Sequence, residues 1–90
     1  MQILAGATQR LSYKEGAFVP DANGDWEVKC LNYWEVQAFS DLAGADHIRR
    51  TFEQALVTVP GATPAQFAEA PKVAYALPLY RAIWDIIRGN

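Results

Sequence analysis

The sequence has few of the side chains from which catalytic and metal sites are built. Its 90 residues include one cysteine, Cys30, one histidine, His47, and two serines, Ser12 and Ser40. A single cysteine excludes a disulfide within the chain. The chain contains no P-loop, no G-x-G-x-x-G, C-x-x-C or H-E-x-x-H pattern and no G-x-S-x-G elbow. We therefore expect a protein that is not an enzyme and that has no catalytic residues, metal ligands or cofactor.

Charge and long apolar runs are also scarce. Charged residues make up 20% of the chain, and its net charge is -2. A general nucleic-acid or anionic-membrane binder normally carries a basic excess instead. No apolar run approaches the roughly 18–20 residues that span a bilayer, and residues 1–12 lack the regions of a secretory signal. The sequence predicts no membrane contact and a cytoplasmic location, in a cell or in an infected host cell.

Apolar residues are abundant, at 51% of the chain, although 15 of them are alanine. Alanine favours helices more than it drives burial. The aromatic residues, 12% of the chain, can each bury about 150–250 Å². A chain of this length holds one domain. We expect a single compact domain over residues 1–90, without covalent staples.

The first third of the chain is typical of β-structure. Residues 10–19 contain a break at Gly16, and residues 26–30 alternate so that Trp26, Val28 and Cys30 share one face. Between these segments, residues 20–25 read PDANGD, a dense turn signal. The pattern predicts a β-hairpin centred on residues 20–25.

The next segment, residues 33–43, is ambiguous. Its alternation suits a third strand, whereas Asn32 followed by Glu35 is the N-cap and N3 pair of a helix. The capping pair favours a helix, and the strand remains the alternative.

Helical patterns follow. From Asp46 to the stop at Pro60-Gly61, the apolar residues keep to one narrow face, and Arg49 can pair with Glu53 on the other. The expected inward residues are Ile48, Phe52, Ala55, Leu56 and Val59. Thr63 to Glu69 predicts a short capped helix, and residues 72–88 a last one, kinked or interrupted by Pro78. The predicted fold class is α+β, an N-terminal hairpin or small antiparallel sheet followed by about three to four helices.

The last helix has the most unusual pattern. Its apolar residues cover an arc of about 200°, twice the stripe of a helix on one core. Either several elements of the domain enclose it, or part of its surface is for another chain. In the second case Tyr80 and Trp84, flanked by Arg81 and Arg88, are the expected partner-binding residues, because Trp, Tyr and Arg dominate binding energy.

Two other readings stay open beside this one. Arg49 and Arg50 follow a segment that superficially resembles a helix-turn-helix, which would make the chain a small DNA-binding regulator, although its turn is too short for the usual register. A Cys–His hydrolase would need Cys30 and His47 to meet; we expect Cys30 to be buried and inert, and His47 to be an exposed residue at a helix start.

By elimination, the sequence predicts a non-catalytic protein–protein interaction module that docks on a larger complex as an adaptor, assembly factor or inhibitor. Its partner would be another protein or a second copy, held through the C-terminal helix. Small phage proteins are often of this kind, an analogy of size alone.

Overall fold

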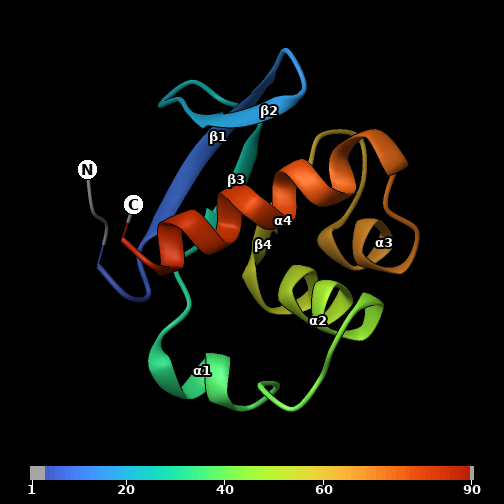
Figure 1. The fold of residues 1–90 in the computed structure, drawn as a ribbon. Helices are drawn as coiled ribbons and strands as arrows, with labels where there is room; N and C mark the ends of the chain where they lie inside the picture. Colours follow the sequence, from blue (N-terminus) through green and yellow to red (C-terminus); the bar gives the residue numbers. More distant parts are fainter. Residues whose placement is uncertain (1–3, 90) are drawn as a thin grey trace.

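Four antiparallel strands and four helices make up residues 4–89, the part of the chain that the computed structural model describes. In chain order they are β1 (Thr8–Lys14), β2 (Ala17–Pro20), β3 (Trp26–Lys29), α1 (Tyr33–Gln37), α2 (Ala45–Ala55), β4 (Leu56–Thr58), α3 (Pro64–Glu69) and α4 (Val73–Ile87). The strands form one sheet in the order β2-β1-β3-β4. The helix α4 lies across the sheet, with α2 and α3 beside it (Figure 1). The predicted α+β fold is confirmed.

The hairpin is not where the sequence predicts it. β1 pairs with β2 through a two-residue turn at Glu15 and Gly16, whose φ angles of 52° and 84° are both positive. Such a turn matches the right-handed twist of two antiparallel strands. β2 and β3 are not neighbours, because the longer β1 lies between them and pairs with both. The hairpin predicted at residues 20–25 is therefore wrong, and the break at Gly16 is the true turn.

Residues 20–25 instead cross β1 to reach its other side. Asp21 accepts a hydrogen bond from the Asn23 backbone N–H at 2.9 Å, which forms an Asx turn. Its other carboxylate oxygen accepts from the Ser12 hydroxyl of β1 at 2.7 Å. A Cβ at Gly24 would lie 2.1 Å from the Leu11 carbonyl oxygen. The turn residues are thus explained by a close crossing of two backbone segments.

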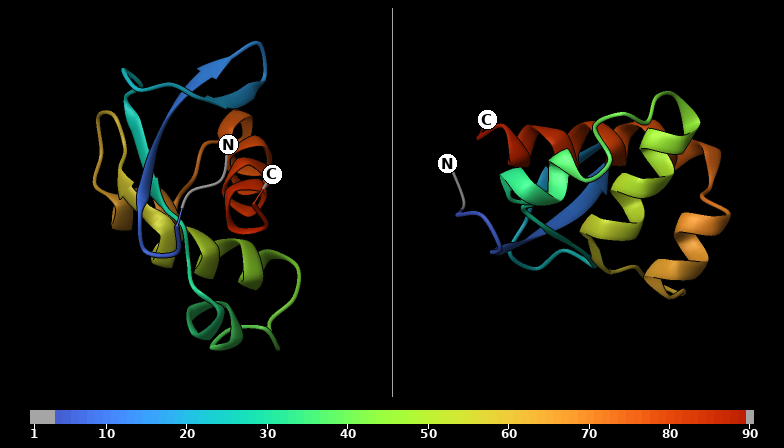
Figure 2. Two further views of the ribbon diagram at one scale, coloured as in Figure 1. Left: turned by 90° about the vertical axis from the view of Figure 1, so that its left-hand side faces the viewer. Right: turned by 90° about the horizontal axis from the view of Figure 1, so that it is seen from below.

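Helix, not strand, follows β3, as the capping pair favours. The Asn32 side chain accepts from the Glu35 backbone N–H at 2.9 Å, and the Glu35 carboxylate accepts from the Asn32 N–H at 3.0 Å. The helix α1 ends at Gln37, well short of the predicted residue 43. Figure 2 shows it projecting beyond the layer formed by the sheet and α4.

The second helix is also shorter than predicted. α2 ends at Ala55, and Leu56–Thr58 becomes the edge strand β4, paired with β3. Leu56 and Val59 are buried as expected, but not from a helix. Both residues would face the core from a helix as well as from a strand. The apolar spacing alone therefore does not distinguish a longer α2 from the strand β4. Arg50, and not Arg49, pairs with Glu53, at 3.2 Å.

The last two helices follow the prediction closely. Thr63 and Gln66 form the capping box of α3, which has Pro64 in its first turn. α4 runs from Val73 to Ile87 as one helix with Pro78 inside it, and Gly89 follows with a φ of 84°. Pro78 therefore does not interrupt the helix.

One hydrophobic core joins the sheet to the helices. Leu11, Trp26 and Val28 bring the sheet's inner face to it, and Cys30 is buried on that same face as predicted. From the helical side, Phe52 and Ala55 of α2 and Phe67 of α3 meet Leu79 and Ile83 of α4. This core holds α4 by the side that carries Leu79 and Ile83.

Candidate functional site

The helix α4 carries an apolar row that continues beyond its own core contacts. Val73, Leu77, Tyr80 and Trp84 follow one another at spacings of four, three and four residues, which places them on one side of a helix. We call these four residues the α4 stripe. Val73 is 93% exposed and Leu77 51%, whereas Tyr80 and Trp84 are half-buried. The stripe is thus covered at one end and open at the other.

The covered end is held by α2. Nδ1 of His47 lies 2.7 Å from the Tyr80 hydroxyl oxygen, and the imidazole stacks on Trp84 with centroids 5.4 Å apart. The Trp84 indole N–H donates to Oγ1 of Thr51 at 3.3 Å. The Thr51 hydroxyl in turn donates to the His47 carbonyl at 2.9 Å. These contacts make Tyr80 and Trp84 part of the monomer's own packing.

His47 is therefore not the exposed residue that the sequence predicts. It lies half-buried between Phe39, Tyr80 and Trp84, with its centroid 5.3 Å from that of Phe39. The helix α2 has two packed sides: Phe52 faces the core, while His47 and Thr51 face α4. Helical periodicity assigns polar residues to the solvent side, because it locates only the apolar face. The prediction that His47 is exposed is wrong for this reason.

Burial raises the pKa of two side chains near α4, the Tyr80 phenol and the Cys30 thiol. It raises the pKa of the Tyr80 phenol above its usual value of 10.0, against a smaller opposing effect of Arg88. Burial also raises the pKa of the Cys30 thiol, and the Glu35 carboxylate adds to this. Both groups are therefore held in their neutral forms near neutral pH, and a neutral thiol is a poor nucleophile.

The structure keeps Cys30 and His47 in different surroundings. The Cys30 thiol lies 3.7 Å from the Ile86 carbonyl oxygen, at the end of α4. His47 has its polar contact with Tyr80 instead. Neither residue contacts the other among the described bonds, so the pair needed for the hydrolase reading is not assembled.

The predicted arginines lie at the surface. Arg81 is exposed on α4 and Arg88 is exposed at its C-cap, where it pairs with Asp85 at 3.1 Å. Arg49 and Arg50 are exposed on α2, where Arg50 is held by Glu53. Residues 72–84 contain two cations, Lys72 and Arg81, and no acidic residue. Lys72 directly precedes the open end of the α4 stripe, Arg81 follows Tyr80 at its covered end, and the next acidic residue, Asp85, pairs with Arg88.

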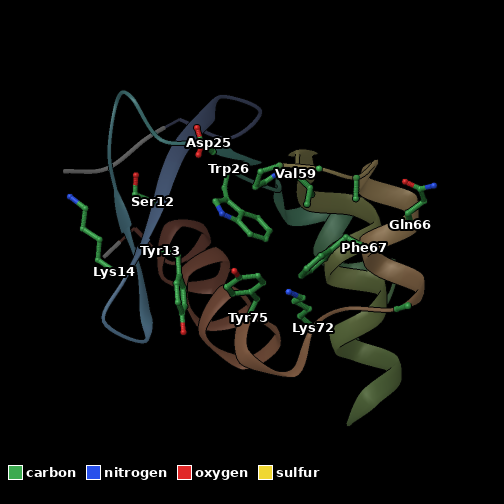
Figure 3. Close-up of a pocket in the computed structure, with 14 residues that line it drawn as sticks. Ser12, Tyr13, Lys14, Asp25, Trp26, Val59, Gln66, Phe67, Lys72 and Tyr75 are labelled. Carbon is green, nitrogen blue, oxygen red and sulfur yellow. The ribbon is translucent and has the colours of Figure 1, made fainter.

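A separate hollow lies on the other side of the start of α4. Figure 3 shows Tyr13, Trp26, Phe67 and Tyr75 gathered around it, with Lys72 among them. Its volume is about 760 Å³, within the range of pockets that bind ligands. We call it the aromatic groove, after these four rings.

Several of these residues escape sequence reasoning. The spacing of Val73 and Leu77 relative to Tyr80 places all three on one helix face, but Pro78 predicts a kink or break between the two halves of the helix. The aromatic groove joins β1, β3, α3 and α4, and no local pattern connects segments so far apart. Tyr33 and Trp34 of α1 were also missed, and they form an exposed edge-to-face pair, 65% and 76% exposed.

Comparison with known proteins adds no relative: no family model, curated protein or solved structure matches the chain. Among residues 4–89, no helix is long and apolar enough to cross a membrane. The same residues include no group of three or more His, Cys, Asp or Glu side chains placed to hold a metal ion.

Proposed function

We propose that the protein is a non-catalytic interaction module that docks on another protein through the α4 stripe. The observation that carries the proposal is the exposure of Val73 and Leu77, at 93% and 51%, in line with the half-buried Tyr80 and Trp84. An apolar row at this spacing is the surface that one helix offers to another helix or to a groove. Arg81 and Arg88 flank the row at its covered end.

The partner that fits best is an amphipathic helix with acidic residues beside its apolar face. It would pack along the first half of α4, where α2 does not reach, and extend the helical layer. A carboxylate of the partner would meet Arg81, which forms no ion pair among the described residues because Asp85 pairs with Arg88. A second copy of α4 would bring a like-charged Arg81 to this place, so charge favours a foreign partner over self-association.

In this proposal the predicted anchors Tyr80 and Trp84 have a supporting role. Tyr80 and Trp84 are bonded to His47 and Thr51 in the monomer, so they shape the floor of the contact. Leu77 supplies its accessible apolar side chain. Because Leu77 is 51% exposed, its burial by a partner would gain about half of the roughly 1.5–3 kcal/mol that full burial of such a side chain is worth.

Site-specific photocrosslinking tests this proposal. p-Benzoylphenylalanine replaces Leu77 in one variant and Val57 in a control, since Val57 is similarly exposed, at 42%, but lies on β4. We expect one discrete crosslinked partner from position 77 in cells that produce the protein, and none from position 57. The same adduct from both positions, or no adduct from position 77, would contradict the proposal.

A further inference from the structure

We propose that the aromatic groove is a second binding site, which takes an extended proline-rich peptide segment carrying an acidic residue. The site is distinct from the α4 stripe, because Tyr75 lies half a turn around α4 from Val73 and packs against Trp26. The inference therefore does not depend on the proposed function.

The rings form a row in which each is turned nearly perpendicular to the next. Tyr13 and Tyr75 are 4.8 Å apart with planes at 77°, and Tyr75 and Trp26 are 5.2 Å apart at 72°. Trp26 and Phe67 follow at 5.4 Å and 81°. The surface of the groove therefore presents ring faces and ring edges in alternation, which makes it apolar and ridged. A polyproline II segment advances about 3.1 Å per residue, so each ring-to-ring step corresponds to between one and two of its residues.

This geometry distinguishes between ligand classes. A planar base or cofactor ring is normally held against a ring face or between two parallel rings, and these neighbouring rings are not parallel. Proline rings pack well on aromatic ridges, and a polyproline II helix needs no internal hydrogen bonds and loses little entropy on binding. The groove therefore fits a proline-rich segment better than a nucleotide.

A bound polyproline II backbone would present carbonyl oxygens that need donors. The side chain of Trp26 makes no hydrogen bond within the described part of the chain, and no buried polar side-chain atom of residues 4–89 is left without a partner. Its indole nitrogen is therefore not fully enclosed, although the residue is only 5% exposed. In Figure 3 the indole nitrogen is on the side turned toward Tyr13. This N–H is the donor that the proposal assigns to a ligand carbonyl.

Charge favours an acidic residue in the ligand, because the groove is lined by two lysines, Lys14 and Lys72, and by one carboxylate, Asp25. The Lys72 ammonium group lies 6.0 Å from the centre of the Tyr75 ring, and no acidic side chain of the described residues pairs with it within 4.0 Å. Lys14, also on the rim, lies 3.9 Å from Asp21. Lys72 is thus the cation available to a ligand carboxylate.

Titration of the ¹⁵N-labelled protein with a synthetic peptide, acetyl-Pro-Pro-Glu-Pro-Pro-Pro-amide, tests the proposal. The indole N–H signal of Trp26 should shift in a saturable way, while that of Trp34, on the exposed face of α1, should not move. Lys72→Glu should weaken binding at least threefold without changing the unliganded spectrum beyond the substitution site. The same peptide with alanine in place of proline should bind at least threefold more weakly.

Other results would overturn the proposal. They are no shift at Trp26 up to millimolar peptide, equal shifts at Trp26 and Trp34, or equal binding of the alanine peptide. A Trp26 shift with adenosine monophosphate but not with the proline peptide would instead assign the groove to planar ligands. Leu77→Glu, which disrupts the α4 stripe, should leave the peptide titration unchanged, so failure at one site is distinguishable from failure at the other.

Discussion

His47 lies against Trp84 with ring centroids 5.4 Å and ring planes 26° apart, and its Nδ1 atom is 2.7 Å from the Tyr80 hydroxyl oxygen. One imidazole from α2 thus fixes two consecutive members of the α4 stripe. Val73 and Leu77, the other two, have no comparable cover and remain exposed. The contact divides the stripe into an end that stabilises the monomer and an end that is available to a partner.

The first prediction concerns that contact. Tyr80→Phe removes the hydroxyl that meets His47 but keeps the ring, so it should lower the free energy of unfolding by about 0.5–1.5 kcal/mol, as for an ordinary hydrogen bond. Urea denaturation measures the loss. Tyr33→Phe is the matched control, because Tyr33 is 65% exposed and its change should be close to zero. Equal effects of the two substitutions would show that the His47 contact contributes nothing.

Gly24 should tolerate substitution worse than a glycine in an open turn. An added Cβ would lie 2.1 Å from the Leu11 carbonyl oxygen, so Gly24→Ala must separate two backbone segments, at a cost of about 1–3 kcal/mol or more. Gly61→Ala meets no atom within 4 Å and is strained only by its φ of 76°, so a cost of about 1–2 kcal/mol is expected. Melting temperatures of the two variants should rank in that order; the reverse order would contradict the close crossing over β1.

The stability of the protein should fall in acid, partly through Glu35. The Glu35 carboxylate accepts hydrogen bonds from the Asn32 backbone N–H and from the Lys29 ammonium group. These bonds, the first more than the second, hold the pKa of this carboxyl below its usual value of 4.5. A lowered pKa in the folded state means that the charged form stabilises the fold above that usual value, and that this contribution is lost as the pH falls through the folded-state pKa. Glu35→Gln keeps a side-chain acceptor for the capping box but has no charge to lose. Its free energy of unfolding should therefore vary less between about pH 5 and pH 3 than that of the native chain; identical curves would refute the role of Glu35.

Cys30 should be unreactive in the folded protein. Its side chain is 4% exposed and burial raises its pKa, so little of the reactive thiolate forms near neutral pH. Modification by a disulfide reagent at about pH 8 should be at least tenfold slower in the native protein than in urea. A native rate equal to that of the unfolded chain would mean that the thiol is accessible and would reopen the nucleophile reading.

The local rules of the sequence predicted much of this fold. The capping pairs at Asn32 and Thr63 mark where two helices start, and the alternation of residues 26–30 identifies the buried face of β3. Each of these signals involves residues only a few positions apart in the chain, so it does not depend on tertiary contacts. The α+β class follows from their order along the chain.

What failed depended on distant contacts. The turn signal at residues 20–25 is real, but which strands it joins depends on β1 lying between them. Likewise, the burial of His47 depends on α4, which begins 26 residues later in the sequence, at Val73. Tyr80 and Trp84, which the sequence predicts as partner-binding residues, lie on one side of α4, and only the structure separates them from the open pair Val73 and Leu77.

The affinity of the partner crosslinked at position 77 tests the central claim most directly. Calorimetry should compare the native chain with Leu77→Glu and with the control Val57→Glu, an equally drastic change on an exposed side chain of β4. We expect Leu77→Glu to weaken binding by at least about tenfold, the equivalent of about 1.4 kcal/mol, and Val57→Glu by less than about twofold. Equal affinities for all three chains would show that the α4 stripe is not the docking surface.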